Sequence, residues 1–270
     1  MKAFVLRSVL LGIFFSGLLG FHASGQDNPS SQQAPAPAPQ TPASTGGGSN
    51  SSQSPQAKGV SNKDLQKQEQ TGTSNDRLFY ALPNFLTVET KDVPPLSAGQ
   101  KFWVVTRGSF DYIQIPWYAF LAGISQAENS EPGYGQGAVG YGKRYGAYFA
   151  DGTIENYMTG AVLPVLLRQD PRFYELGKGS FLHRTSYAVS RIFVTRTDAG
   201  KEQFNYSEVV GSAISSGIST YSYHPKGDRT LPNTASVWGS QVGYDTITIV
   251  VKEFWPDIRR KLSKKKQPAP

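Results

Sequence analysis

Small residues recur at every fourth position between Gly137 and Pro171, and this repeat constrains the fold more than any other feature of the sequence. Residues four apart lie on one side of an α-helix, so the repeat predicts a long helix with one face of small side chains. Glycine in a helix costs about 1 kcal/mol relative to alanine. We expect the close approach of a second helix to offset this cost. The residues expected in this contact are Ala138, Gly142, Gly146 and Ala150.

Two later segments carry the same spacing, one over 206–221 and the other from about 233 towards 265. We expect both to be helices that meet the first helix along their small residues. Those residues include Gly211, Ser215, Gly239 and Gly243. The alternative is a β-strand over 244–252, where β-branched residues partly alternate. The four-residue spacing favours the helical interpretation.

Capping patterns and apolar spacing predict the remaining helices. The segment Ser97–Gln100 matches a capping box and precedes an apolar helical pattern over 101–129, and Asn205–Glu208 matches a second box. A further helix is predicted over 180–197, and Pro164 should kink the long first helix. The sequence therefore predicts an all-α fold, a compact bundle of about five helices.

The N-terminal 25 residues have the pattern of a secretory signal peptide, with a basic start, an apolar run and small residues before Gln26. The apolar run is short for a membrane span, so cleavage is favoured over an uncleaved anchor. Residues 26–77 are rich in Ser, Gln, Pro, Ala and Gly, which predicts a disordered linker. The predicted organisation is a signal peptide at 1–25, the linker at 26–77, a helical globular domain at 78–262 and a basic disordered tail at 263–270.

Cysteine is absent from the chain. This excludes a lipid-anchor cysteine, disulfides and thiol chemistry. Export without disulfides fits a protein of the bacterial periplasm or outer envelope whose core is large enough to be stable alone.

The net charge of +7 is unevenly distributed. Six basic residues lie between 259 and 270, whereas 78–258 holds 15 basic and 16 acidic residues. A near-neutral domain argues against nucleic-acid binding, which needs a basic patch on the folded surface. The tail is most simply a solvated terminus, with contact to anionic lipid or acidic wall polymer as the alternative.

Small residues four apart are also typical of helix pairs inside membranes. No segment after the signal peptide has the ~20 apolar residues that a span needs. The expected helices also carry charges such as Lys143, Asp151 and Lys252. We therefore expect a soluble or surface-associated domain, with membrane insertion as the alternative.

Asp151 and Glu155 lie four apart and are expected to share a helix face. Such a pair can do acid–base chemistry if its two environments separate the pKa values. Pairing with nearby cations is the simpler interpretation. The candidate catalytic residues are Asp151, Glu155, Lys143, Arg144 and His183.

The sequence indicates no metal site and no cofactor. His183 and His224 lack metal-site spacing. Residues 135–140 match GxGxxG, but they follow a predicted loop rather than a strand, so dinucleotide binding is not expected.

Three sequence blocks resemble an uncharacterised family of exported bacterial proteins. They are Gly140–Gly146 (GYGKRYG), Arg168–Tyr174 (RQDPRFY) and Asn205–Ser207 (NYS). In that family GYGKRxGA, HQDPRYF and NYS recur in the same order, and Arg168 stands where histidine is often found. The resemblance covers roughly residues 100–262. It implies an exported helical protein and no particular reaction.

The favoured interpretation is a non-enzymatic interaction or structural domain of the cell envelope on a flexible stalk. Its candidate partners are a membrane surface, the cell wall or another envelope protein. The alternative is an envelope hydrolase that acts on wall glycan or lipid with the carboxylate pair. An enzyme should place that pair in an open pocket, whereas an interaction domain should pair these charges and expose a coherent apolar patch.

Overall fold

A computed structural model describes residues 77–78, 82–83, 86–88 and 93–264, all within the unit Ser61–Pro270. The predicted signal peptide, nearly all of the predicted linker and the end of the predicted tail lie outside these residues. Arg77 belongs to the fold, because its guanidinium donates to the Asp111 carboxylate at 2.6 and 3.0 Å. Arg77 is the last residue of the predicted linker and is among the described residues.

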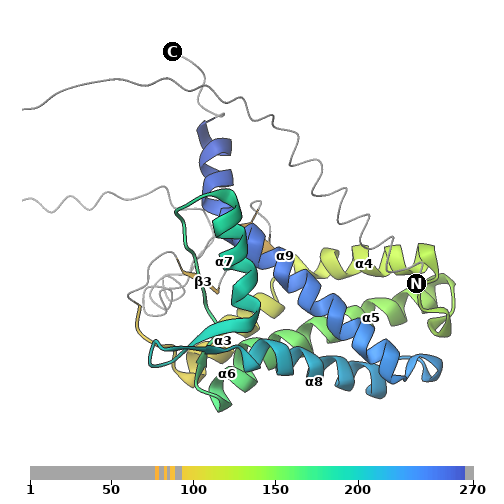
Figure 1. Cartoon of the computed structure of the whole chain (residues 1–270). Coiled ribbons are helices and arrows are strands. Elements are labelled where there is room, and N and C mark those ends of the chain that lie inside the picture. The colour runs from red at the N-terminus through yellow and green to blue at the C-terminus, as the bar shows by residue number, and fades with distance from the viewer. Residues whose placement is uncertain (1–76, 79–81, 84–85, 89–92, 265–270) are drawn as a thin grey trace, which may run out of the picture. The chain divides into compact units, whose positions relative to one another are not determined.

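The described region is mainly helical, which confirms the all-α prediction. Figure 1 shows α4, α5 and α8 running lengthwise beside one another, with α9 crossing them and α7 along α9. Contacts join α4 to α5, α5 to α8, α8 to α9 and α7 to α9. The helices are α3 (Ala98–Ser109), α4 (Gln114–Glu128), α5 (Gly137–Tyr157), α6 (Leu163–Leu166), α7 (Phe181–Phe193), α8 (Tyr206–Ser222) and α9 (Leu231–Lys264).

The sequence signals for helix starts hold, but several predicted ends differ. Ser97 and Gln100 form the capping box of α3, and Asn205 accepts from Glu208 N at α8. The helical region predicted over 101–129 is divided near Gly108, where glycine is expected to break it, because the chain turns at Phe110 between α3 and α4. A π-helical turn, η2 (Met158–Val162), separates α5 from α6 just before Pro164.

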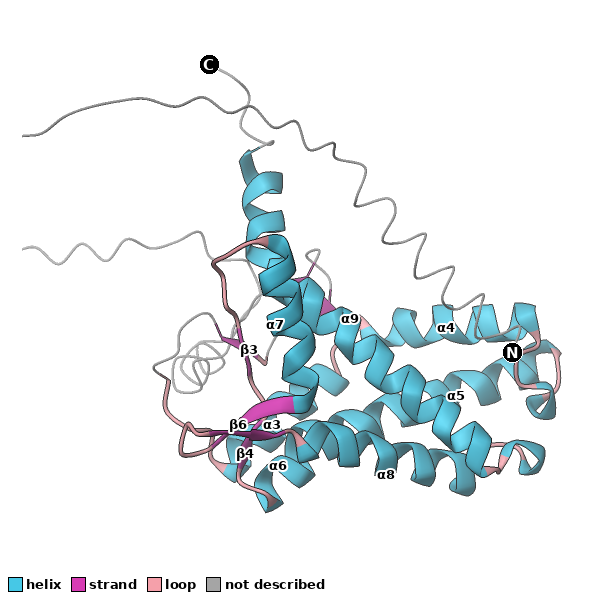
Figure 2. Cartoon of the chain, in the orientation of Figure 1, coloured by secondary structure: helices cyan, strands magenta, loops and turns pink. Residues whose placement is uncertain are grey.

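Short strands connect the helices (Figure 2), and the sequence analysis did not predict them. β4 (Gln169–Asp170) pairs antiparallel with β6 (Val194–Thr197), and β6 pairs with β7 (Glu202–Phe204). Thus the helix predicted over 180–197 ends early and continues as a strand. β3 (Thr87–Val88) pairs in parallel with β5 (Phe173–Tyr174), and β1 (Arg77–Leu78) pairs with β2 (Leu82–Pro83).

The small-residue face of α5 does not contact another helix among the described residues. Gly142 and Gly146 are exposed, and a Cβ built at either would meet no atom within 4 Å. The buried residues of α5 are Gly140, Arg144 and Ala147. They are offset by about two residues from the small-residue repeat, so they lie on the opposite side of the helix. Ala138 is also exposed and Ala150 is half-buried.

Other glycines make the close contacts. A Cβ on Gly152 would lie 2.0 Å from the Tyr118 hydroxyl, and one on Gly160 would lie 2.7 Å from Val105 Cγ2. On α8, a Cβ on Gly211 would lie 3.3 Å from the backbone of Met158, which lies outside the small-residue face of α5, and Ser215 is fully buried. The predicted contact on α9 is missing, because Gly239 and Gly243 have open space around them.

Candidate functional site

Asp151 on α5 binds side chains at the end of α8. Its carboxylate accepts hydrogen bonds from the hydroxyls of Ser219 and Tyr223, and His224 Nε2 lies 3.3 Å from its second oxygen. Burial opposes a charged imidazole, but bonding to Asp151 outweighs burial and raises the pKa of His224. Burial, together with Asp151, also raises the pKa of Tyr223. Three side chains therefore engage Asp151, which links α5 to the C-terminal end of α8.

Glu155 lies one turn further along α5 in a different environment. Its Oε1 atom is shielded from solvent and has no hydrogen-bond partner among the described residues. Burial, followed by the charges of Asp245 and Asp151, raises the pKa of Glu155 to about 9. Asp151 and Glu155 thus share a helix face, as predicted, but Glu155 is a neutral acid at pH 7.

Two more carboxyl groups face this interior from the neighbouring helices. Burial, and then Asp245, raises the pKa of Glu208 on α8 well above its usual range. Burial also raises the pKa of Asp245 on α9 and lowers that of Lys252. The interior between α5, α8 and α9 is therefore polar and sparingly charged.

The other candidate catalytic residues lie apart from this pair. Lys143 and His183 are exposed. Arg144 is fully buried and donates to the carbonyl oxygens of Gly135 and Glu131 at 2.6 and 2.8 Å, so it holds the loop before α5. The five candidates do not form one site. Within the described part of the chain, no group of three metal-binding side chains has suitable geometry.

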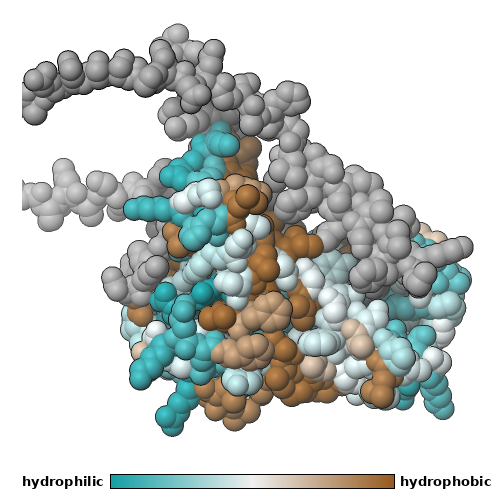
Figure 3. Space-filling model, viewed as in Figure 1, coloured by the Kyte–Doolittle hydropathy of each residue, from teal (hydrophilic) through white to brown (hydrophobic). Residues whose placement is uncertain are grey.

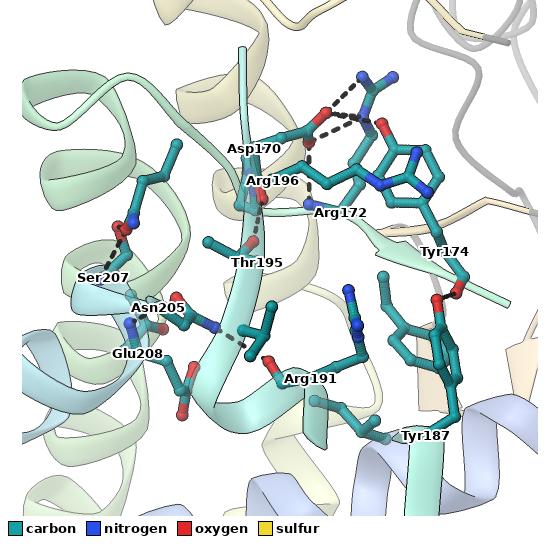
Figure 4. Close-up of a pocket in the computed structure, with 16 residues that line it drawn as sticks. Asp170, Arg172, Tyr174, Tyr187, Arg191, Thr195, Arg196, Asn205, Ser207 and Glu208 are labelled. Carbon is teal, nitrogen blue, oxygen red and sulfur yellow. Dashed lines mark hydrogen bonds and ion pairs between the residues drawn. The ribbon is translucent and has the colours of Figure 1, made fainter. Parts of the chain in front are cut away.

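A cavity of about 80 Å³ lies elsewhere, between β4–β5, the junction of α7 with β6, and the start of α8 (Figure 4). The blocks Gln169–Tyr174 and Asn205–Ser207 both line it, although they are far apart in sequence. Gln169 links them directly, because its Oε1 accepts from the Ser207 hydroxyl at 2.6 Å. Neither Asp151 nor Glu155 lines this cavity.

Arginines dominate the charge of the cavity. Arg172 and Asp170 form a buried pair at 2.7 Å, and the Tyr174 hydroxyl donates to the same carboxylate oxygen at 2.7 Å. Arg196 lies over the Tyr174 ring at 4.2 Å, and Arg191 lies over another tyrosine ring at 4.6 Å. The Asp170–Arg172 pair fixes the turn between β4 and β5, as buried pairs commonly specify arrangement.

The outer face of α8 is a second notable surface. The helix has one charged residue, Glu208, whose carboxyl oxygen Oε1 is shielded from solvent. The residues exposed on α8 are uncharged and almost all apolar or aromatic: Tyr206, Val210, Ala213, Ile214, Ile218, Tyr221 and Ser222. We call the first six of these the docking face. In Figure 3, apolar residues gather along the lower edge of the molecule, over α6 and α8.

An apolar and basic edge continues this face. Leu166 and Leu167 are 71% and 43% exposed at the end of α6, and Phe204 packs edge-on against Tyr206. Asp198 N donates to the Arg168 carbonyl, which joins this turn to the β6–β7 hairpin. We call Leu166, Leu167, Arg168, Lys201 and Phe204 the docking edge.

Among the described helices, none combines the length and the apolar character that a membrane span requires.

Comparisons with protein-family models, curated proteins and solved structures found no match for this chain. The resemblance to exported bacterial proteins therefore stays a prediction.

Sequence reasoning singled out the blocks that line the cavity but not Arg196, which also lines it. Arg196 lies on β6, a strand that the sequence analysis did not predict. A signal did exist for α8, because a 17-residue helix with one charge is unusual for a surface helix.

Proposed function

We propose that this protein is an exported, non-enzymatic docking domain of the bacterial cell envelope that associates with an anionic lipid surface. The observation that carries the proposal is the docking face, a solvent-exposed helix surface without a charged side chain. Monomeric soluble proteins rarely expose contiguous apolar surface of this kind, and such patches are typical of interaction sites.

The docking edge favours lipid over protein as the occupant. Leu166 and Leu167 protrude beside Arg168, and protruding apolar residues beside a cation suit insertion between anionic head groups. Arg168 and Lys201 make no ion pair within the described region, whereas the nearby acids Asp198 and Glu202 are paired with Lys101 and Arg191. The unpaired charge at this edge is thus positive. Tyrosine rings along the face suit the boundary between head groups and acyl chains.

The carboxylate pair gives no support to a hydrolase. Asp151 is engaged by three side chains, Glu155 lies between helices, and neither reaches the cavity. An acid–base pair has to reach substrate within hydrogen-bond distance. The geometry favours a structural role for both residues.

Vesicle flotation of the purified protein tests the proposal. We expect it to float with vesicles containing phosphatidylglycerol, and less with neutral phosphatidylcholine vesicles. Leu166→Glu should abolish flotation, because it places a negative charge at the docking edge. Val139→Glu is the matched control, since Val139 is 70% exposed and lies at the start of α5.

Two results would overturn the lipid proposal. One is a wild-type protein that fails to float with either vesicle. The other is a dimer, measured by light scattering after size exclusion, that Ile214→Glu dissociates while flotation is unchanged. That second result would assign the docking face to a second copy of the chain.

A further inference from the structure

The cavity between β4–β5, the α7–β6 junction and α8 contains hydrogen-bond donors without acceptors. The guanidinium of Arg196 makes no hydrogen bond or ion pair with any residue in the described ranges, and it rests on the Tyr174 ring. Arg191 donates from Nη1 to Glu202 at 2.8 Å, but its buried Nε has no acceptor among the described residues. A cavity lined by such donors leaves hydrogen-bonding capacity unused, and that of Arg191 Nε is buried.

The two arginines are held in place before any ligand arrives. Arg191 stacks on the Tyr187 ring at 4.6 Å, and the Tyr187 hydroxyl donates to the Tyr174 carbonyl at 2.6 Å. The rings under the two guanidinium groups are therefore linked to each other (Figure 4). Preorganised donors lose less conformational entropy when they bind an anion.

The acidic groups of the cavity do not neutralise these cations. Asp170 is occupied by Arg172 and by the Tyr174 hydroxyl. Glu208 has a raised pKa because of burial and Asp245. A side-chain hydrogen bond with Asp245 contributes to this raised pKa. Protonated Glu208 therefore donates to Asp245 and is not a competing anion.

We propose that this cavity binds a phosphate-type oxyanion, with Arg196 and Arg191 as the principal donors. Guanidinium groups pair well with phosphate and carboxylate oxygens. Two guanidinium groups supply N–H donors from α7 and β6, which suits a tetrahedral dianion better than a carboxylate. One water needs about 10–15 Å³, so a volume of about 80 Å³ accommodates a group of several heavy atoms. The site goes beyond the docking function and does not rest on it.

Isothermal titration of the purified protein with inorganic phosphate tests the site, with acetate at equal ionic strength as comparison. We expect saturable phosphate binding and weaker acetate binding. Arg196→Gln should weaken phosphate binding about tenfold or more, because it removes charge-assisted hydrogen bonds, and Arg196→Lys should restore part of the affinity. Lys178→Gln is the matched control, since it removes one exposed charge that lies outside the docking edge and does not line the cavity.

Vesicles that contain phosphatidic acid separate the two sources of such a group. If Arg196→Gln weakens binding to both phosphate and these vesicles, the ligand is a lipid head group. If it weakens phosphate binding alone, the ligand is a free phosphate. Absence of phosphate binding by the wild type overturns the site, as does an equal loss in Lys178→Gln. Leu166→Glu should retain phosphate binding. Failure of the docking proposal can therefore be distinguished from failure of the phosphate site.

Discussion

The two faces of α8 reverse the arrangement expected of a surface helix. Apart from Gly211, its buried residues are all serine or threonine, whereas its exposed residues, apart from Ser222, are apolar or aromatic. Surface helices usually turn their apolar stripe to the core. Small hydroxyl side chains let helices approach closely, so the inner face serves packing. Folding of this chain alone does not account for the outer face, which is why we assign it to docking.

Glycine has a different role on each of the two faces of α5. On the inner face, Gly152 faces the Tyr118 hydroxyl with no room for a Cβ, while Gly146 on the outer face has open space. Glycine is therefore a packing requirement at one position and only a helix-weakening residue at the other. Matched substitutions at these positions separate the two roles.

Gly152→Ala should have the largest effect on stability. The new Cβ would lie 2.0 Å from the Tyr118 hydroxyl, and overpacking of this kind costs about 1–3 kcal/mol or more. Urea denaturation measures the loss. Adding Tyr118→Phe should recover part of it, because the closest atom is removed. Unchanged stability in Gly152→Ala would show that α4 and α5 are not packed as described.

Buried Glu155 on the inner face of α5 should also make the free energy of unfolding depend on pH. Glu155 keeps its proton to about pH 9 in the folded state, against an ordinary value of 4.5. Between these values the folded state binds more protons than the unfolded state, so stability falls as pH rises. The slope from this group is at most about 1.4 kcal/mol per pH unit.

Glu155→Gln should reduce that slope, because it removes the titrating group and keeps a similar shape. Part of the slope should remain, since burial also raises the pKa values of Glu208 and Asp245. Urea denaturation at a series of pH values between 5 and about 9 provides the comparison. An identical slope in the variant would contradict the buried, neutral state of Glu155.

Gly146→Ala should change stability in the opposite direction to Gly152→Ala. The position is exposed and unobstructed, so alanine should stabilise the helix by up to about 1 kcal/mol. The same urea titration measures this gain. A loss of stability would mean that the outer face of α5 is in contact after all.

Ile214→Glu should have the smallest effect on folding. Ile214 is 40% exposed on the docking face, and surface substitutions usually change stability by about 0.5 kcal/mol or less. Flotation with anionic vesicles should nevertheless be lost. A large destabilisation instead would indicate that this face belongs to the core.

The sequence predicted the helices well because their starts are local. The side chains of Ser97 and Asn205 each accept a hydrogen bond from the backbone N–H three residues further on. The small-residue spacing of α5 likewise identified a face, but spacing alone does not say which neighbour that face meets. In this chain the neighbours contact the opposite face, through Arg144 and Ala147.

The sites depend on residues that are distant in sequence, so local patterns did not reveal them. The raised pKa of Glu155 comes from burial and from Asp245 on another helix. The cavity joins segments around Asp170, Arg196 and Ser207, of which two are strands too short to have a recognisable period.

The most direct measurement follows from the absence of cysteine in the chain. Ile214→Cys would carry a polarity-sensitive fluorophore on the docking face, and Val139→Cys would carry it on α5 at a more exposed position. With phosphatidylglycerol vesicles, the docking account predicts a blue-shifted, brighter emission at position 214 and unchanged emission at position 139. Unchanged emission at position 214, or an equal change at both positions, would contradict it.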